Sequence, residues 1–388
     1  MERPVHALRV LVKAFLFFVL LNLLFAWFDP PIGKLTAYNW LWPGRLRFPY
    51  ADSPGYYSLG YNVPVIEDFD AMFGAHILSA GPKPADEFRV LLLGDSATWG
   101  GHVAPEDMLA EQFNRLGLTS CDGRKIKAYD LGYPWPSLLR DVLILDYANQ
   151  YQPDMVIWLV TLHSFEKKSA DREFLVPHAE RMAEVIAEHQ LVLPKVYSGQ
   201  AEPAFWDKTI LGQRERLKKL ILNQAYGWMW SATGIDNANG LSKDHPVFPQ
   251  DAPADVSYFD YQSPNDSQAL TRSLMFDIIR VGREIAGDAP LVVINEPIFI
   301  ISGQNSNLRY NHVYPRWAYD AYRQSLADWM NAQGDPYYDT WNALPVSEFS
   351  NDMSHRDPQG EKRFADLLSP ILQDFSCQIA RSQKSPDF

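Results

Sequence analysis

The chain has 388 residues, of which 47% are hydrophobic, so it can bury a large core and wholesale disorder is excluded. A net charge of −12 without a basic cluster excludes duplex nucleic acid as a partner. Cys121 and Cys377 are too few and too far apart for a CxxC redox motif, a four-cysteine zinc site or a disulfide scaffold. The nine histidines lack metal-binding spacing and no Gly-rich phosphate loop is present, so we expect neither a metal nor another cofactor.

A nearly continuous apolar run occupies Val10–Phe28. It is long enough to cross the ~30 Å hydrocarbon layer of a membrane. Arg3 and Arg9 precede it, so the positive-inside rule places the N-terminus in the cytoplasm and the rest of the chain in the periplasm or at the cell surface. A cleaved signal peptide is the alternative, but the run is long for one and no small-x-small pattern precedes Asp29. We expect residues 1–28 to be an uncleaved signal anchor.

This orientation gives the two cysteines a possible use. In an oxidising compartment, Cys121 and Cys377 could form a disulfide that closes a large loop. Two buried free thiols are the alternative, because the sequence does not set the distance between them.

Alternating strand and helix patterns begin near residue 88. Short apolar runs predict strands, and longer amphipathic stretches between them predict helices, an order that implies parallel pairing with right-handed crossovers. The expected strands are 89–93, 126–131, 155–160 and 290–295, and the expected helices are 106–116, 138–151, 267–286, 316–333 and 359–375. We therefore expect a loop-rich connection over 29–86, an α/β domain over 87–376 and a tail over 377–388.

An insertion at about 165–265 interrupts this alternation. It contains the stretch Leu211–Trp230, whose apolar residues share one side of a helix and whose start is basic. This stretch fits an interfacial helix or a lid. The alternative is a helix that packs on its own domain, and this is the commoner case.

Three short motifs carry residues suited to nucleophilic catalysis. Gly94-Asp95-Ser96 follows the first strand directly, Gly132 follows the second, and Asp352-Met353-Ser354-His355 precedes the last helix. The carboxyl ends of parallel strands meet where α/β proteins bind their ligands. There His355 could take the proton of Ser96, with Asp352 accepting the other ring N–H. The backbone N–H groups of Ser96 and Gly132 could then stabilise the resulting oxyanion.

With these motifs, the chain resembles the SGNH (GDSL-type) hydrolases over about residues 88–165 and 287–375. The resemblance implies a flavodoxin-like α/β/α sandwich. It also implies the catalytic residues Ser96, Asp352 and His355, with Gly132 as an oxyanion donor.

One block departs from the family pattern. Where the family has Gly-x-Asn-Asp, whose Asn supplies an oxyanion donor, this chain has Thr161-Leu162-His163-Ser164. His163 could donate from a ring nitrogen, or it could be a structural histidine. Asn295 could also substitute, although a strand-end turn explains it better. Without such a donor the barrier rises by ~3 kcal/mol, which would favour slow or specialised chemistry.

An anchored, extracytoplasmic chain of this kind is similar to family members that remove or transfer acyl groups, often acetyl, on cell-envelope polysaccharides. Trp99, Tyr133 and Trp135 lie near the expected site and could stack on sugar faces, whereas Trp158 suits core packing. His102 is interpreted as a surface residue rather than a substrate contact. The expected partners are the membrane, a carbohydrate ester or acyl donor, and a membrane acyltransferase.

Three functions remain open from the sequence. The first is a serine esterase or O-acyltransferase, with no feature that decides between hydrolysis and transfer. The second is a catalytically silent protein that binds a glycan or scaffolds a membrane complex, an interpretation favoured by the missing Asn. The third is a lipase-like ester hydrolase, suggested by the anchor and the basic amphipathic stretch.

Overall fold

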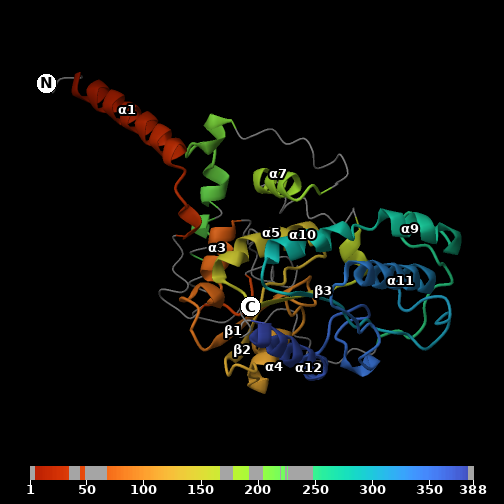
Figure 1. Ribbon diagram of the computed structural model, residues 1–388. Coiled ribbons are helices and arrows are strands. Elements are labelled where there is room, and N and C mark those ends of the chain that lie inside the picture. Colours follow the sequence, from red (N-terminus) through yellow and green to blue (C-terminus); the bar gives the residue numbers. More distant parts are fainter. Residues whose placement is uncertain are drawn as a thin grey trace.

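The computed structural model describes residues 5–34, 44–48, 68–166, 178–191, 204–218, 220–222, 225 and 248–382. In this part of the chain, five parallel strands form one sheet in the order β2-β1-β3-β4-β5 (Figure 1). The strands are β1 (Glu87–Leu93), β2 (Lys125–Asp130), β3 (Met155–Val160), β4 (Leu291–Asn295) and β5 (Tyr337–Asp339). This is the flavodoxin-like order, so the predicted fold class is confirmed.

Burial explains which strands the sequence could reveal. β1, β3 and β4 are buried along their whole lengths, as the inner strands of a parallel sheet are, and each is nearly all apolar in sequence. Strand β5 was not among the predicted strands. It lies at the sheet edge and is half-buried or exposed, so Tyr337-Tyr338-Asp339 carries no apolar run.

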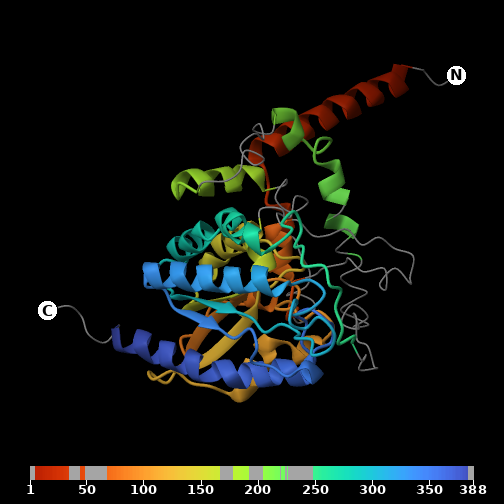
Figure 2. The same ribbon diagram turned by 90° about the vertical axis from the view of Figure 1, so that its right-hand side faces the viewer.

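Helices cover both faces of the sheet, as Figure 2 shows. One core joins the sheet to α5 (Leu138–Ala148), α10 (Asp277–Ala286) and α11 (Arg316–Gln333). A second core joins its other face to α4 (Leu109–Leu116) and α12 (Pro358–Ser382). The short 3-10 helices are η1 (Ile32–Lys34), η3 (Ile77–Ser79), η4 (Pro105–Asp107), η5 (Asn149–Tyr151), η6 (Leu162–Phe165), η9 (Phe205–Lys208), η11 (Pro264–Asp266) and η12 (Val346–Glu348).

The helix expected over 267–286 is two helices, α9 (Ser267–Ser273) and α10. The chain leaves helical geometry at Leu274, and the Met275 N–H donates to the Phe165 carbonyl instead of continuing the helix. Trp158 lies in the core as expected, and its indole N–H donates to Asp141.

Part of the predicted 29–86 connection is helical. Helix α3 (Phe69–Ala75) is capped at its N-terminus by Asp68, whose carboxylate accepts the Ala71 N–H. Phe73 packs against Tyr147 of α5 with 4.6 Å between ring centroids, so this helix belongs to the core. Residues 35–43 and 49–67 of the connection lie outside the described residues.

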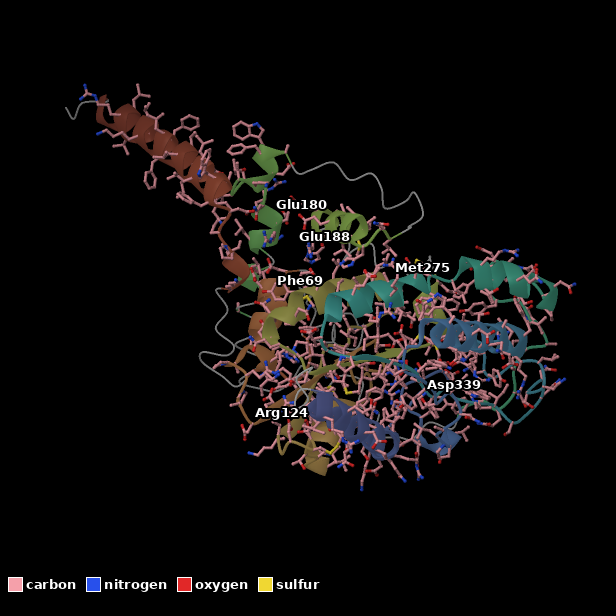
Figure 3. All side chains as sticks on the ribbon, viewed as in Figure 1. Phe69, Arg124, Glu180, Glu188, Met275 and Asp339 are labelled. Atoms are coloured by element: carbon pink, nitrogen blue, oxygen red, sulfur yellow. A yellow bond between two sulfur atoms is a disulfide. The ribbon has the colours of Figure 1, made fainter. Side chains whose placement is uncertain are left out.

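Helix α1 (Val5–Phe28) projects away from the α/β domain (Figure 1). Its segment Ala7–Phe28 has a mean hydropathy of 2.3, and among the described residues it is the one helix long and apolar enough to cross a membrane. Its side chains stand clear of the domain along most of its length (Figure 3). A membrane anchor and a signal sequence both have this form.

Cys121 and Cys377 form a disulfide, with their Cα atoms 4.7 Å apart. The open question of their pairing is thereby settled in favour of the bond. It ties the loop before β2 to helix α12, which continues to Ser382, six residues past the expected end of the domain at 376. The tail is therefore shorter than expected, and residues 383–388 lie outside the described residues.

Replacing both cysteines by serine should lower the free energy of unfolding by about 2–4 kcal/mol, because the crosslink restricts the unfolded chain across 256 residues of sequence. Chemical unfolding of the full chain in detergent measures this difference. Wild-type protein under a reducing agent should unfold like the variant, as a matched control. Identical midpoints for oxidised wild type and variant would contradict the stabilising role.

Candidate active site

The candidate catalytic residues gather at the carboxyl edge of the sheet. Ser96 lies just after β1, Gly132 just after β2 and His163 just after β3. β1 pairs with both neighbours, so these three strand ends are adjacent. His355 reaches the same edge from the turn before α12 and lies beside Ser96.

Ser96 and His355 are in direct contact, with Ser96 Oγ 2.7 Å from His355 Nε2 across 259 residues of sequence. Gly101 makes room for this approach. A Cβ at position 101 would lie 3.3 Å from His355 Nε2 and 3.0 Å from the Ser96 carbonyl oxygen. A serine hydroxyl hydrogen-bonded to an imidazole is the arrangement through which serine is activated as a nucleophile.

The other ring nitrogen of His355 faces an amide. Asn351 Nδ2 lies 2.8 Å from His355 Nδ1. Its Oδ1 accepts the backbone N–H groups of Met353, Ser354 and His355, so the amide orientation is fixed by the turn. Nδ2 therefore donates to Nδ1, and the ring carries its proton on Nε2 and donates it to Ser96 Oγ. In this tautomer His355 cannot take the serine proton.

Asp352 does not contact His355 in this structure. Its carboxylate lies 3.0 Å from Nδ1 of His312 on the half-exposed surface of the domain. The predicted Ser96–His355 pair is assembled, and the predicted Asp352–His355 pair is not. The cause is local, because the Asn351 side chain closes the turn one position earlier and occupies the space beside the ring.

His355 is held neutral by its surroundings. Burial, together with neighbouring His102 and the positive charge of Arg356, lowers the pKa of His355 to about 3. The His102 ring packs edge-on against His355 at 4.7 Å between centroids, and its Nδ1 lies 3.4 Å from the Ser350 carbonyl oxygen. The interpretation of His102 as a surface residue was wrong, because His102 is part of the wall around the base.

Arg356 connects the histidine turn to the serine turn. Its fully buried guanidinium donates to the carbonyl of Ala97, the residue after Ser96, at 3.1 Å. It also pairs with Glu296 at 2.8 Å and with Glu361 at 3.0 Å. Burial raises the pKa of Glu296 to about 8, and the positive charge of Arg356 offsets this effect only in part. These bonds hold the chain on both sides of the Ser96–His355 contact.

The predicted oxyanion donors differ in what they offer. The Gly132 N–H donates to the Asp130 carboxylate at 2.8 Å and is not available. Gly132 is needed for close packing, because a Cβ there would lie 2.5 Å from the Trp99 nitrogen. Among the described residues, the Ser96 N–H has no acceptor. Asn295 is buried and bonded to Asp339, so it is structural, as the sequence favoured.

His163 lies on η6 at the same edge. Burial lowers its pKa to about 4, so the ring is neutral at pH 7 and one of its nitrogens carries a proton. Nε2 lies 3.7 Å from Glu166, and the aromatic rings of Tyr258, Phe259 and Tyr314 pack around it. A neutral imidazole in this place can act as a hydrogen-bond donor.

Two of the three aromatic residues predicted to contact substrate are buried. Trp99 is 4% exposed and donates its indole N–H to the Phe48 carbonyl, and Tyr133 is 1% exposed. Neither ring has a face open to a sugar. Trp135 is 63% exposed and lies on the loop after β2. Phe259, which the sequence did not single out, is also exposed, and its ring centroid lies 5.0 Å from that of His163.

Among the described residues, no group of three or more His, Cys, Asp or Glu side chains could hold a metal ion. Several site residues were not predicted: Asn351, His102, Arg356, Glu296 and Phe259. Only adjacency gave a signal for Asn351 and Arg356, since they flank the Asp-x-x-His motif. The contacts of Glu296 and Phe259 depend on chain folding from distant segments.

No family model matches the chain, and no curated protein matches it. Solved structures similar to it include a family two carbohydrate esterase from Cellvibrio japonicus, at 10% identity and a TM-score of 0.33 over 74% of this chain and 61% of that one. A putative arylesterase from Agrobacterium tumefaciens matches at 13% identity and a TM-score of 0.33 over 74% and 99%. A family 3 carbohydrate esterase from Clostridium thermocellum matches at 11% and 0.32 over 75% and 99%. Likeness this distant decides nothing about activity.

The low pKa of His355 gives a test of the resting site by pH. With Asn351 rather than a carboxylate beside the ring, the imidazole should stay neutral at pH 5, where a histidine of ordinary pKa would be only about 3% neutral. The ring chemical shifts of His355 in NMR spectra recorded from pH 7.5 to pH 5 measure this, with His355→Ala to assign the signal. A titration centred near pH 6.5 would contradict the burial of the base.

Proposed function

We propose that this protein is a serine esterase or O-acyltransferase that acts on acyl esters, in particular acetyl esters, of a cell-envelope or exported carbohydrate. The observation that carries this proposal is the 2.7 Å contact of Ser96 with a half-buried His355 at the carboxyl edge of the sheet. The remaining site residues supply orientation, oxyanion donors and aromatic surface.

The proposed reaction proceeds through an acyl-enzyme. His355 takes the Ser96 proton as Oγ bonds to the ester carbonyl carbon. The tetrahedral intermediate collapses, the carbon–oxygen bond to the alcohol breaks, and His355 returns the proton to that oxygen. Water or a sugar hydroxyl then gives its proton to His355 and attacks the acyl-serine, the bond between the acyl carbon and Oγ breaks, and His355 returns the proton to Ser96. Hydrolysis and transfer differ only in this acceptor. The Ser96 N–H and the His163 ring are the proposed oxyanion donors.

Asp352 is the proposed third member of the triad. His355 can receive the serine proton only with its own proton on Nδ1, and this tautomer needs an acceptor where Asn351 now donates. Asp352 follows Asn351 in sequence. Its side chain is half-exposed and has His312 as its partner. We propose that the 351–354 turn opens and Asp352 exchanges His312 for His355 when the site becomes active.

The location and substrate class rest on other features. A disulfide persists in oxidising compartments, which supports an extracytoplasmic domain behind α1 as an uncleaved anchor. Exposed Trp135 and Phe259 are aromatic surfaces of the kind that stack on sugar rings. We propose a carbohydrate ester or acyl donor as substrate and a membrane acyltransferase as partner.

Ser96→Ala should abolish both hydrolysis of an activated aryl acetate and labelling by a fluorophosphonate, because it removes the hydroxyl that contacts His355 and would form the acyl bond. Initial rates and labelling of the full chain in detergent measure this. Ser369→Ala, which removes a hydroxyl on α12 that bonds back to the Asp366 carbonyl of its own helix, serves as the matched control and should keep the activity. Equal behaviour of wild type and Ser96→Ala would contradict catalysis and favour a silent glycan-binding protein.

Asp352→Asn should lower kcat by about 10³–10⁴-fold, because His355 then loses the carboxylate that selects the productive tautomer. His312→Ala, which frees the same carboxylate from its resting partner, should leave kcat unchanged or raise it. Steady-state kinetics with the aryl acetate measure both. A change of less than about threefold in Asp352→Asn would show that Asp352 stays on the surface, and that it has no part in catalysis.

A further inference from the structure

The 204–218 segment lies against helix α1. The Leu211 N–H donates to Asn22 Oδ1 at 3.1 Å, and Asn22 Nδ2 donates to the Phe18 carbonyl within the helix. Asn22 is therefore not a random break in the apolar run, because it binds the backbone of this segment. Figures 1 and 3 both show the segment beside the end of α1 that meets the domain.

The segment is also fixed to the domain. Arg216 forms an ion pair with Asp68, and that carboxylate caps helix α3 at the same time. The 204–218 segment thus joins the anchor to the domain by one polar contact on each side. Its distance from the membrane follows from its place on α1.

That place is at the membrane surface if the hydrocarbon-spanning part of α1 ends near Asn22. From Val5 to Asn22 the helix rises by 17 residues, about 26 Å at 1.5 Å per residue, which is close to the ~30 Å thickness of the hydrocarbon layer. Leu211 then lies at the level of the outer headgroup and acyl boundary, and the last six residues of α1 extend beyond it. The 204–218 segment can therefore lie at the membrane interface and pack on its own chain at the same time.

The exposed side chains suit that level. Trp206 is 68% exposed and Leu211 is 54% exposed, and Phe205 is exposed beside Trp206. Aromatic residues concentrate at membrane interfaces. The segment has four basic residues against two acidic ones in a chain of net charge −12, and Arg214 and Lys218 are exposed. Basic side chains near an apolar surface favour lipid headgroups.

We propose that the 204–218 segment is a second membrane-contacting element, which lies in the lipid headgroup region beside α1 and seats Phe205, Trp206 and Leu211 at the acyl boundary. This inference rests on the proposed role of α1 as a membrane anchor. It makes the domain sit close to the bilayer in one orientation rather than move on a free tether.

Depth-dependent fluorescence quenching tests the proposal on the full chain in liposomes. An environment-sensitive dye is attached to a single cysteine introduced by Trp206→Cys, by Phe17→Cys in the middle of α1, or by Lys362→Cys on exposed α12. Nitroxide lipids carry the quencher in the headgroup or deep in the acyl chain. We expect the dye at 206 to lose most of its emission to the headgroup quencher, the dye at 17 to the deep quencher, and the dye at 362 to neither.

The three positions separate the possible failures. If position 17 is quenched and position 206 behaves like 362, the anchor stands and the interfacial role of the segment is overturned. If position 206 is quenched more by the deep lipid, the segment lies inside the hydrocarbon and the proposed level is overturned. If position 17 is not quenched, the anchor itself fails. Phe205→Cys provides a second position that should match 206.

Discussion

The structure depends on one buried cation that faces carboxylates from two segments and a carbonyl from a third. Arg356 joins the turn that carries His355 to the turn that carries Ser96, through the Ala97 carbonyl. Glu296, just after β4, and Glu361 on α12 accept its other hydrogen bonds. Removing one member of such a buried ion pair leaves a charge without its partner and costs about 3–5 kcal/mol. The distance between nucleophile and base therefore depends on this network as much as on the two residues themselves.

The same network contributes to the electrostatics of the base. Burial is the main cause of the lowered pKa of His355, and the positive guanidinium of Arg356 adds to it by disfavouring the imidazolium. In a serine hydrolase the imidazolium forms during the reaction and needs a negative partner. The half-exposed Asp352 is the adjacent carboxylate able to supply it, so activation and the movement of the 351–354 turn are physically linked. A site at rest with the wrong tautomer is the expected consequence of a neutral Asn351 beside the ring.

The sheet could be predicted because its inner strands β1, β3 and β4 carry apolar runs, and parallel strands with helical crossovers allow few topologies. Ser96 and His355 could be predicted because their motifs lie at strand or helix ends, which the fold brings to one edge. The sequence could not decide whether Asn351 or Asp352 contacts the His355 ring, since the two residues are adjacent in the chain. The burial of Trp99 and Tyr133 could not be decided either, because aromatic residues near a site fit both a core and a ligand surface. Contacts such as Phe259 with His163 join segments about 96 residues apart and leave no local pattern.

The fixed attachment of α1 explains why the Asn22 amide is tolerated in an apolar helix. An amide at an apolar boundary costs free energy when it lacks partners, but Asn22 bonds both to its own helix and to the Leu211 backbone. The same contact gives the Leu211 N–H an acceptor where the 204–218 segment meets the apolar helix. The contact also limits rotation of the domain about the helix axis, and the Arg216–Asp68 pair transmits that limit to α3 and through it to the core. Under the proposed function, in which the substrate is a cell-envelope or exported carbohydrate, such a restraint determines which face of the domain, and therefore which edge of the sheet, the substrate can reach.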